Sequence, residues 1–268
     1  MSTTSTTPTT ITDADVLNFA LNLEYLEAEF YLRAATGNGL SAADVGTNAG
    51  AVSGGTQVPW GTSGLANYAN EIAQDELNHV RYLRSALQAA GATPVDRPQI
   101  DFTNSFSALA VAAGIVPAGG TFNPFSSPLA FLVGAFVFED VGVTAYSGAA
   151  PLLTSKTILS AAAGIQAVEA YHAAEIRTLL VGMAANSGDQ TYVGYANKVS
   201  ALRGMLGGGN ETTLSVSSIV AADTTNAIGF SRSTDQVLHI VYAQGAGVQT
   251  KGGFYPAGMN GTIKATAA

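Results

Sequence analysis

Apolar residues recur every three to four positions along four long stretches of the chain, which is the period of an amphipathic α-helix. These stretches cover residues 13–35, 64–90, 128–149 and 152–186. Thr12 or Asp13 can cap the first stretch, Gly91 ends the second, and Pro151 separates the third from the fourth. The pattern therefore predicts four long helices and an all-α fold, with the helices packed as a four-helix bundle.

The segments between these stretches have the composition of loops. Residues 36–63 are rich in Gly, Ser, Thr and Asn. Residues 92–127 contain four prolines around one short predicted helix, 105–113. We therefore expect a long crossover loop between the second and third long helices.

Three regions are expected along the chain. Residues 1–11 are polar and predict a disordered tail, residues 12–187 form the bundle, and residues 188–268 form a C-terminal extension packed on it. Within the extension, helices are predicted over 192–206 and 234–243, with irregular coil after Gly245. Residues 211–232 show no clear period.

The charged residues that interrupt the apolar stripes are the candidates for chemistry. Glu76 is followed three residues later by His79, and Glu169 by His172, so two of the three histidines belong to the same Glu-x-x-His pattern. Residues three apart on a helix project from one face. Each pair is therefore expected to point into the bundle.

The other two long helices each place one Glu on the corresponding stripe. Glu24 lies in the first and Glu139 in the third, and each is followed seven residues later by a tyrosine, Tyr31 or Tyr146. Seven residues are about two helical turns, so each tyrosine lies near the face of its glutamate. We expect these tyrosines to be buried hydrogen-bonding residues that support the site.

Four buried carboxylates need compensating positive charge. Two divalent ions supply that charge when the two histidines are neutral, and one Glu from each of two helices with Glu-x-x-His from two others is the pattern of di-metal bundles. Carboxylate and imidazole ligands suit Mn or Fe. The predicted ligands are Glu24, Glu76, His79, Glu139, Glu169 and His172. The alternative is a metal-free core held by Glu–His and Glu–Tyr hydrogen bonds.

Several neighbouring charges leave the assignment open. Glu27 competes with Glu24 as the ligand from the first helix, or lies behind the ligands and orients one of them. Glu175 has the same supporting role or is a surface charge. Glu71, Asp75 and Asp140 are expected to be solvated or salt-bridged, and Arg81, Arg84 and Arg177 on the same helices are plausible partners. His239 and Trp60 are expected to be structural.

Composition narrows the function classes. Asp, Glu, Lys and Arg make up only 11% of the chain, and the net charge is −8, so a basic nucleic-acid-binding patch is excluded. The absence of Cys excludes disulfides and thiolate metal sites. No signal peptide or transmembrane segment is predicted, and the abundance of Ser, Thr, Asn and Gly with little Lys weakly favours an exported mature protein.

The chain resembles the ferritin-like superfamily, and within it the family of plant desiccation-related proteins and their bacterial relatives. The resemblance rests on Val16–Tyr31 (VLNFALNLEYLEAEFY), Gln236–Tyr242 and Gly252–Gly261. The superfamily, which includes manganese catalases, implies di-metal redox chemistry with O₂ or peroxide. The narrower family implies an association with stress or desiccation.

Two functions are therefore expected from the sequence. The preferred one is a di-manganese catalase-like or di-iron oxidase activity, in which peroxide or O₂ reacts at the site. The other is a non-catalytic stress protein, in which metal stabilises the bundle and the low-charge surface mediates assembly. A homo-oligomer is expected in either case.

Overall fold

The computed structural model describes residues 10–267, so most of the predicted tail, residues 1–11, lies outside the described part of the chain. The long helices are α1 (Asp13–Thr36), α2 (Leu65–Ala89), α4 (Pro128–Ala149) and α5 (Lys156–Ser187). The shorter ones are α3 (Thr103–Ala112), α6 (Thr191–Leu206) and α7 (Thr234–Val241). A 3-10 turn, Ala150–Leu152, separates α4 from α5. The predicted all-α fold is confirmed.

The helix ends follow the capping residues in the sequence. Thr12 and Asp15 form a capping box at the start of α1, with the Thr12 side chain accepting from the Asp15 backbone N–H and the Asp15 carboxylate accepting from the Thr12 N–H. Ser127 caps α4, where Pro128 occupies the first turn. Gly37 ends α1 in the left-handed conformation, with a φ of 83°.

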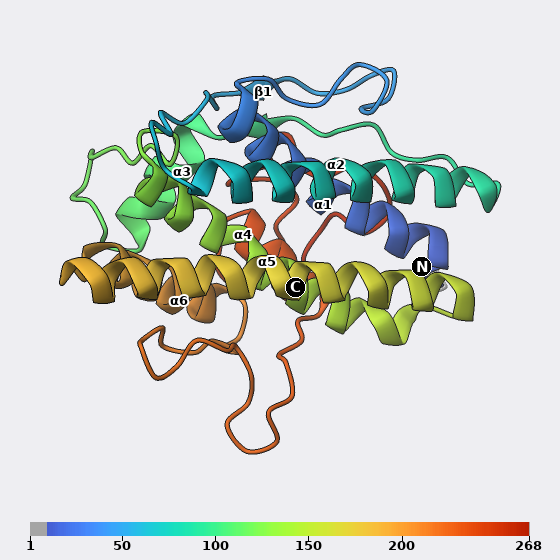
Figure 1. The fold of residues 1–268 in the computed structure, drawn as a ribbon. Helices are drawn as coiled ribbons and strands as arrows, with labels where there is room; N and C mark the ends of the chain where they lie inside the picture. Colours follow the sequence, from blue (N-terminus) through green and yellow to red (C-terminus); the bar gives the residue numbers. More distant parts are fainter. Residues whose placement is uncertain (1–9, 268) are drawn as a thin grey trace.

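The four long helices pair as two antiparallel hairpins, α1 with α2 and α4 with α5 (Figure 1). The hairpins meet where α1 packs against α4, so these two helices form the centre of the bundle. Ring packing around Phe30 of α1 joins them, with Phe131 stacked at 5.5 Å and Phe138 edge-on at 5.3 Å.

Helix α1 is buried on almost every face, although its sequence predicts a single inward stripe. The difference arises because the C-terminal tail covers the outer face. Tyr255 donates a hydrogen bond to the Asn22 carbonyl at 2.8 Å, and the Asn22 side chain accepts from the Asn260 N–H at 3.0 Å. The tail therefore completes the core around α1.

The two long loops are joined by a small element that the sequence pattern did not predict. Strands β1 (Val52–Ser53) and β2 (Ile100–Asp101) pair in parallel. Nearby, Glu29 of α1 binds both Arg33 and Arg97, which ties the second loop to the first helix. The crossover is thus anchored on the bundle.

Among residues 10–267, one helix, Pro128–Leu152, is long and apolar enough to cross a membrane by length and composition. Its most apolar window is 89% buried inside the protein, which is the environment of a bundle-core helix. Burial in the core therefore accounts for the apolar composition of this helix.

Candidate metal centre

The six predicted ligands converge at the centre of the bundle. Each long helix contributes at least one carboxylate, and all six side chains are buried. Their oxygen and nitrogen atoms form two groups in which every donor lies within 4.8 Å of the others. The groups are Glu24, Glu76, His79 and Glu169, and Glu76, Glu139 and His172.

The Nδ1 atom of His79 lies among three carboxylates. It is 3.2 Å from an oxygen of Glu24, 3.5 Å from Glu76 and 3.3 Å from Glu169. None of these contacts has hydrogen-bond geometry. Donors bound to one ion at about 2.1 Å lie about 3 Å apart in octahedral geometry, so these spacings fit a shared ion.

His172 occupies the equivalent place in the other half. Its Nδ1 lies 3.0 Å from Glu76 and 3.6 Å from Glu139, again without a hydrogen bond. Its other ring nitrogen, Nε2, lies 3.2 Å from the Asp75 carboxylate. A carboxylate on Nε2 favours the tautomer that leaves Nδ1 free as a ligand.

The two tyrosines hold the glutamates of α1 and α4 in a reciprocal arrangement. Tyr31 of α1 donates to Oε1 of Glu139 on α4, and Tyr146 of α4 donates to Oε1 of Glu24 on α1. In each glutamate the second oxygen, Oε2, has no partner. The hydrogen bonds therefore fix one oxygen of each carboxylate and leave the other facing the centre.

Glu76 and Glu169 differ from these terminal glutamates. Neither oxygen of either side chain has a hydrogen-bond partner among the described residues, although all four oxygens are buried. Both residues belong to two of the donor groups. Carboxylates with two free oxygens between two donor groups have the disposition required to bridge two ions.

These unpartnered atoms test whether the residues fit a metal centre. Buried polar atoms in proteins are almost always hydrogen-bonded, and an isolated buried carboxylate is strongly unfavourable. Here the orphaned atoms of six side chains cluster together and face one another. The donor set consists of carboxylate and imidazole, so it suits a divalent metal ion.

The pKa values reflect the same shortage of positive charge. Burial, followed by the charge of Glu24, raises the pKa of Glu76 to about 7. Burial and the charge of Glu169 raise the pKa of Glu27 well above its usual value. Burial by itself would lower the pKa of His172, but the negative charge of Glu139 raises that pKa to about 12. Protons substitute for cations in this cluster.

The two supporting glutamates lie in different places. Glu27 joins the centre and forms a third donor group with Glu139 and Glu169. Glu175 belongs to none of the donor groups and lines an outer groove instead. Both Glu24 and Glu27 lie at the centre. Position alone therefore does not decide which of the two is the ligand from α1.

A groove of about 640 Å³ between α2 and α5 reaches the centre from outside. Its lining includes His172 together with Glu71, Asp75, Glu175 and the aromatic ring of Tyr171. Tyr171 is 76% exposed. The groove is the side on which solvent approaches a histidine of the cluster.

The remaining predicted charges make separate contacts. Asp140 is buried and accepts hydrogen bonds at 2.7 Å from Arg177 and from Arg203, an arginine of α6 that sequence reasoning did not select. Arg81 pairs with Asp44, and Arg84 donates to Tyr25, so neither contacts Glu71 or Asp75. The structural roles expected of Trp60 and His239 agree with their hydrogen bonds to backbone carbonyls.

Asp75 was expected to be solvated or salt-bridged, and it is partly exposed and paired, but its partner is a histidine and none of the three arginines. It contacts His172 from the neighbouring hairpin while its own side chain remains 40% exposed. No local signal distinguishes it from Glu71, because the contact depends on how α2 and α5 are placed side by side.

Taken together, the fold and the cluster define a four-helix bundle with a buried carboxylate–histidine centre of metal-binding composition. The ferritin-like domain family matches residues 12–182, which include all four long helices. The chain belongs to the ferritin-like family, which confirms the resemblance found in the sequence.

Two known proteins are similar to this chain over most of its length. The chain is 30% identical to "Desiccation-related protein PCC13-62" of Craterostigma plantagineum over 243 residues, which cover 84% of this chain and 76% of the relative. It is 28% identical to "Ferritin-like catalase Nec2" of Nesocodon mauritianus over 278 residues, which cover 94% of this chain and 84% of the relative.

Proposed function

We propose that the protein binds two divalent Mn or Fe ions at the bundle centre and uses them in redox chemistry with peroxide or O₂. The observation that supports this most is the set of buried, unpartnered donor atoms facing one another from four helices. Glu24 and His79 would hold one ion, and Glu139 and His172 the other. Glu76 and Glu169 would bridge them.

A catalase-like reaction is the preferred form of this activity. Two molecules of hydrogen peroxide become two of water and one of O₂, so one peroxide is reduced while the other is oxidised. A metal pair held by these residues would supply the two-electron redox couple for this reaction. The relative described as a ferritin-like catalase supports this choice by similarity.

The chain's own residues would orient and insulate this chemistry. Tyr31 and Tyr146 fix the terminal glutamates, and Asp75 fixes the tautomer of His172. The aromatic rings of Phe125 and Phe131 pack against Phe30 within the core. A ligand set held in this way needs little rearrangement when metal binds.

Metal analysis combined with an oxygen-electrode assay tests the proposal. The full chain, loaded with Mn²⁺ or Fe²⁺ and freed of excess metal, is expected to hold two ions and to evolve O₂ from hydrogen peroxide. His172→Ala should lose metal and activity together. Two bound ions without turnover with peroxide or O₂ would contradict the redox role, and absence of bound metal would contradict the metal centre itself.

The second candidate is a stress protein in which metal only stabilises the bundle. Similarity to a desiccation-related protein favours it, as do the exposed apolar side chains of Val216, Val220 and Ile228 in the segment after α6, which could support self-association. In this case metal should raise the melting temperature without turnover, and light scattering should detect an oligomer. Val220→Ser should then shift the oligomer toward the monomer.

A further inference from the structure

Helices α1 and α4 carry the same functional pattern with one exception. Each has a glutamate followed seven residues later by the tyrosine that binds the other helix's glutamate. Three residues after the glutamate, however, α1 has Glu27 whereas α4 has Gly142. Helices α1 and α4 are therefore alike at the glutamate and tyrosine positions and unlike at this one.

Gly142 leaves the space that the Glu27 carboxylate uses. A β-carbon at residue 142 would lie 3.2 Å from Oε1 of Glu27 and would collide with Oε2 of Glu169. Any larger residue on α4 would therefore displace one or both carboxylates. The glycine and the extra glutamate are complementary features of the same half-site.

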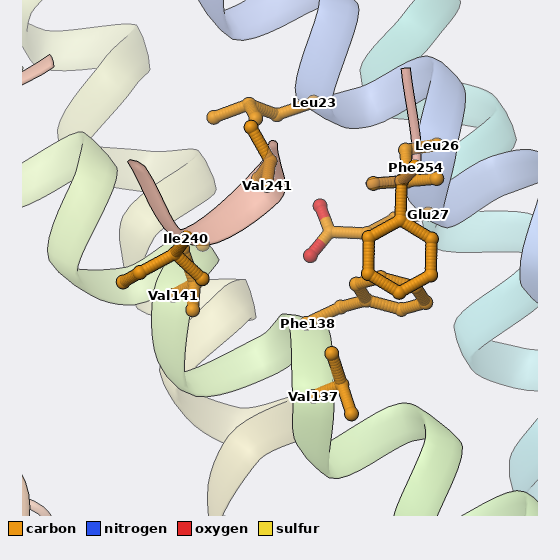
Figure 2. Close-up of a pocket in the computed structure, with 10 residues that line it drawn as sticks. Leu23, Leu26, Glu27, Val137, Phe138, Val141, Ile240, Val241 and Phe254 are labelled. Carbon is orange, nitrogen blue, oxygen red and sulfur yellow. The ribbon is translucent and has the colours of Figure 1, made fainter. Parts of the chain in front are cut away.

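The surroundings of Glu27 offer no other partner for a charge. Figure 2 shows its carboxylate within a pocket walled by apolar side chains, including Phe138 and Val141 of α4 and Val241 of α7. Glu27 is 4% exposed, and none of the side-chain hydrogen bonds among residues 10–267 reaches its oxygens. The pocket has a free volume of only about 20 Å³, which is about one water molecule.

On its other side Glu27 faces the cluster. One of its oxygens lies within 4.8 Å of donor oxygens of Glu139 and Glu169. A carboxylate between an apolar wall and two further carboxylates is strongly unfavourable unless a cation or a proton lies between them. A cation at this point would be held by oxygen atoms from three helices.

We propose that Glu27 is a seventh protein ligand, which binds the ion shared with Glu139 and Glu169 and makes the two metal positions unequal. This inference rests on the proposed di-metal function. The position on the His172 side has one more carboxylate than the position on the His79 side. The ion on the His172 side is therefore bound more tightly and is loaded first.

Calorimetric titration of the metal-free full chain with Mn²⁺ tests this inference. The unaltered protein should bind two ions in two steps with different dissociation constants. Glu27→Gln, which keeps the shape but removes the anionic donor, should weaken the tighter step by at least about tenfold and leave the weaker step unchanged. Glu175→Gln is the matched control, because it removes the same charge outside the donor groups.

Electron paramagnetic resonance of the Mn²⁺-loaded forms gives a second readout that does not depend on turnover. At one equivalent of Mn²⁺, the unaltered protein should show a single bound species, and Glu27→Gln should distribute the ion between two. Glu27→Asp retains a shortened carboxylate, and its tighter step should lie between those of Glu27→Gln and the unaltered protein. Circular dichroism establishes that each variant is folded.

The outcomes separate this inference from the function on which it rests. If the unaltered protein binds no Mn²⁺ or Fe²⁺, the di-metal proposal fails. If it binds two ions and Glu27→Gln leaves both steps within threefold of their original values, only the role of Glu27 is wrong. Glu27 would then be a protonated residue that donates to Glu169.

Discussion

Replacing Glu76 by glutamine tests the electrostatics of the centre, because the effect should change sign when metal binds. Glu76 is fully buried, and neither of its oxygens has a hydrogen-bond partner. Burial and then the charge of Glu24 raise its pKa from 4.5 to about 7. In the metal-free protein this carboxylate therefore opposes folding whenever it is ionised.

The magnitude follows from the pKa difference between the folded and unfolded chain. The rise from 4.5 to about 7 corresponds to about 3 kcal/mol. Because the folded state holds the proton more tightly, the penalty is absent below the unfolded pKa, grows between the two values and is complete above the folded pKa. Metal-free Glu76→Gln should be more stable than the unaltered protein by about 3 kcal/mol at pH 8, and by less than about 1 kcal/mol at pH 5.

Metal should reverse this order. An ion that binds only the folded state adds about 2.7 kcal/mol at a concentration a hundred times its dissociation constant. Glutamine is neutral and cannot supply the charge of a bridging carboxylate, so the Glu76→Gln variant should lose most of this gain. The unaltered protein should then be the more stable of the two in saturating Mn²⁺.

Urea denaturation at pH 5 and pH 8, with EDTA or with Mn²⁺, measures these differences. Glu71→Gln is the control, because it removes the same charge from an exposed position on α2. Equal stabilisation of the unaltered protein and Glu76→Gln by Mn²⁺ would refute the assignment of Glu76 as a ligand. A metal-free Glu76→Gln protein that is less stable at pH 8 would refute the electrostatic reasoning.

Three further predictions concern residues around the centre. Tyr31→Phe removes the donor to Glu139 and should lower the unfolding free energy of the metal-free protein by about 1–3 kcal/mol in urea denaturation, because the acceptor stays buried. Asp75→Asn should weaken Mn²⁺ binding about 10–100-fold in calorimetry, because His172 loses the carboxylate on Nε2; unchanged affinity would argue against this role. Phe30→Ala should cost about 3–5 kcal/mol, measured by urea denaturation, because it empties the centre of an aromatic cluster.

The bundle could be predicted because its signals are local. Apolar periodicity, capping residues and the Glu-x-x-His spacing all act within one helix, and they locate the four long helices closely. The start of α5 was placed at Leu152 instead of Lys156, because Pro151 and Leu152 belong to a 3-10 turn that precedes the helix. The β1–β2 pair could not be predicted, since two residues in each of two distant loops carry no periodic pattern.

The six central residues could be found from sequence because each lies on the apolar stripe of its own helix. The positions of the supporting residues depend on how the helices pack against one another. Glu27 and Glu175 each lie within one helical turn of a predicted ligand, so their spacing along the sequence does not show which of them reaches the centre. The structure places Glu27 against the centre because α4 offers Gly142 there, and it leaves Glu175 in the outer groove. Asp75 likewise needs the neighbouring hairpin to bring His172 within 3.2 Å.

Many of the chain's few charged side chains are buried. Of the thirty charged side chains, eleven are buried, and eight of those are acidic. Arg177, Arg203 and Arg232 neutralise the acids beside the extension, and Glu29 has its own arginines. The carboxylates of the centre have only two histidines. The other buried acids named here are therefore paired with arginine, whereas the carboxylates of the centre outnumber its histidines. The centre lacks positive charge, which bound metal ions would supply.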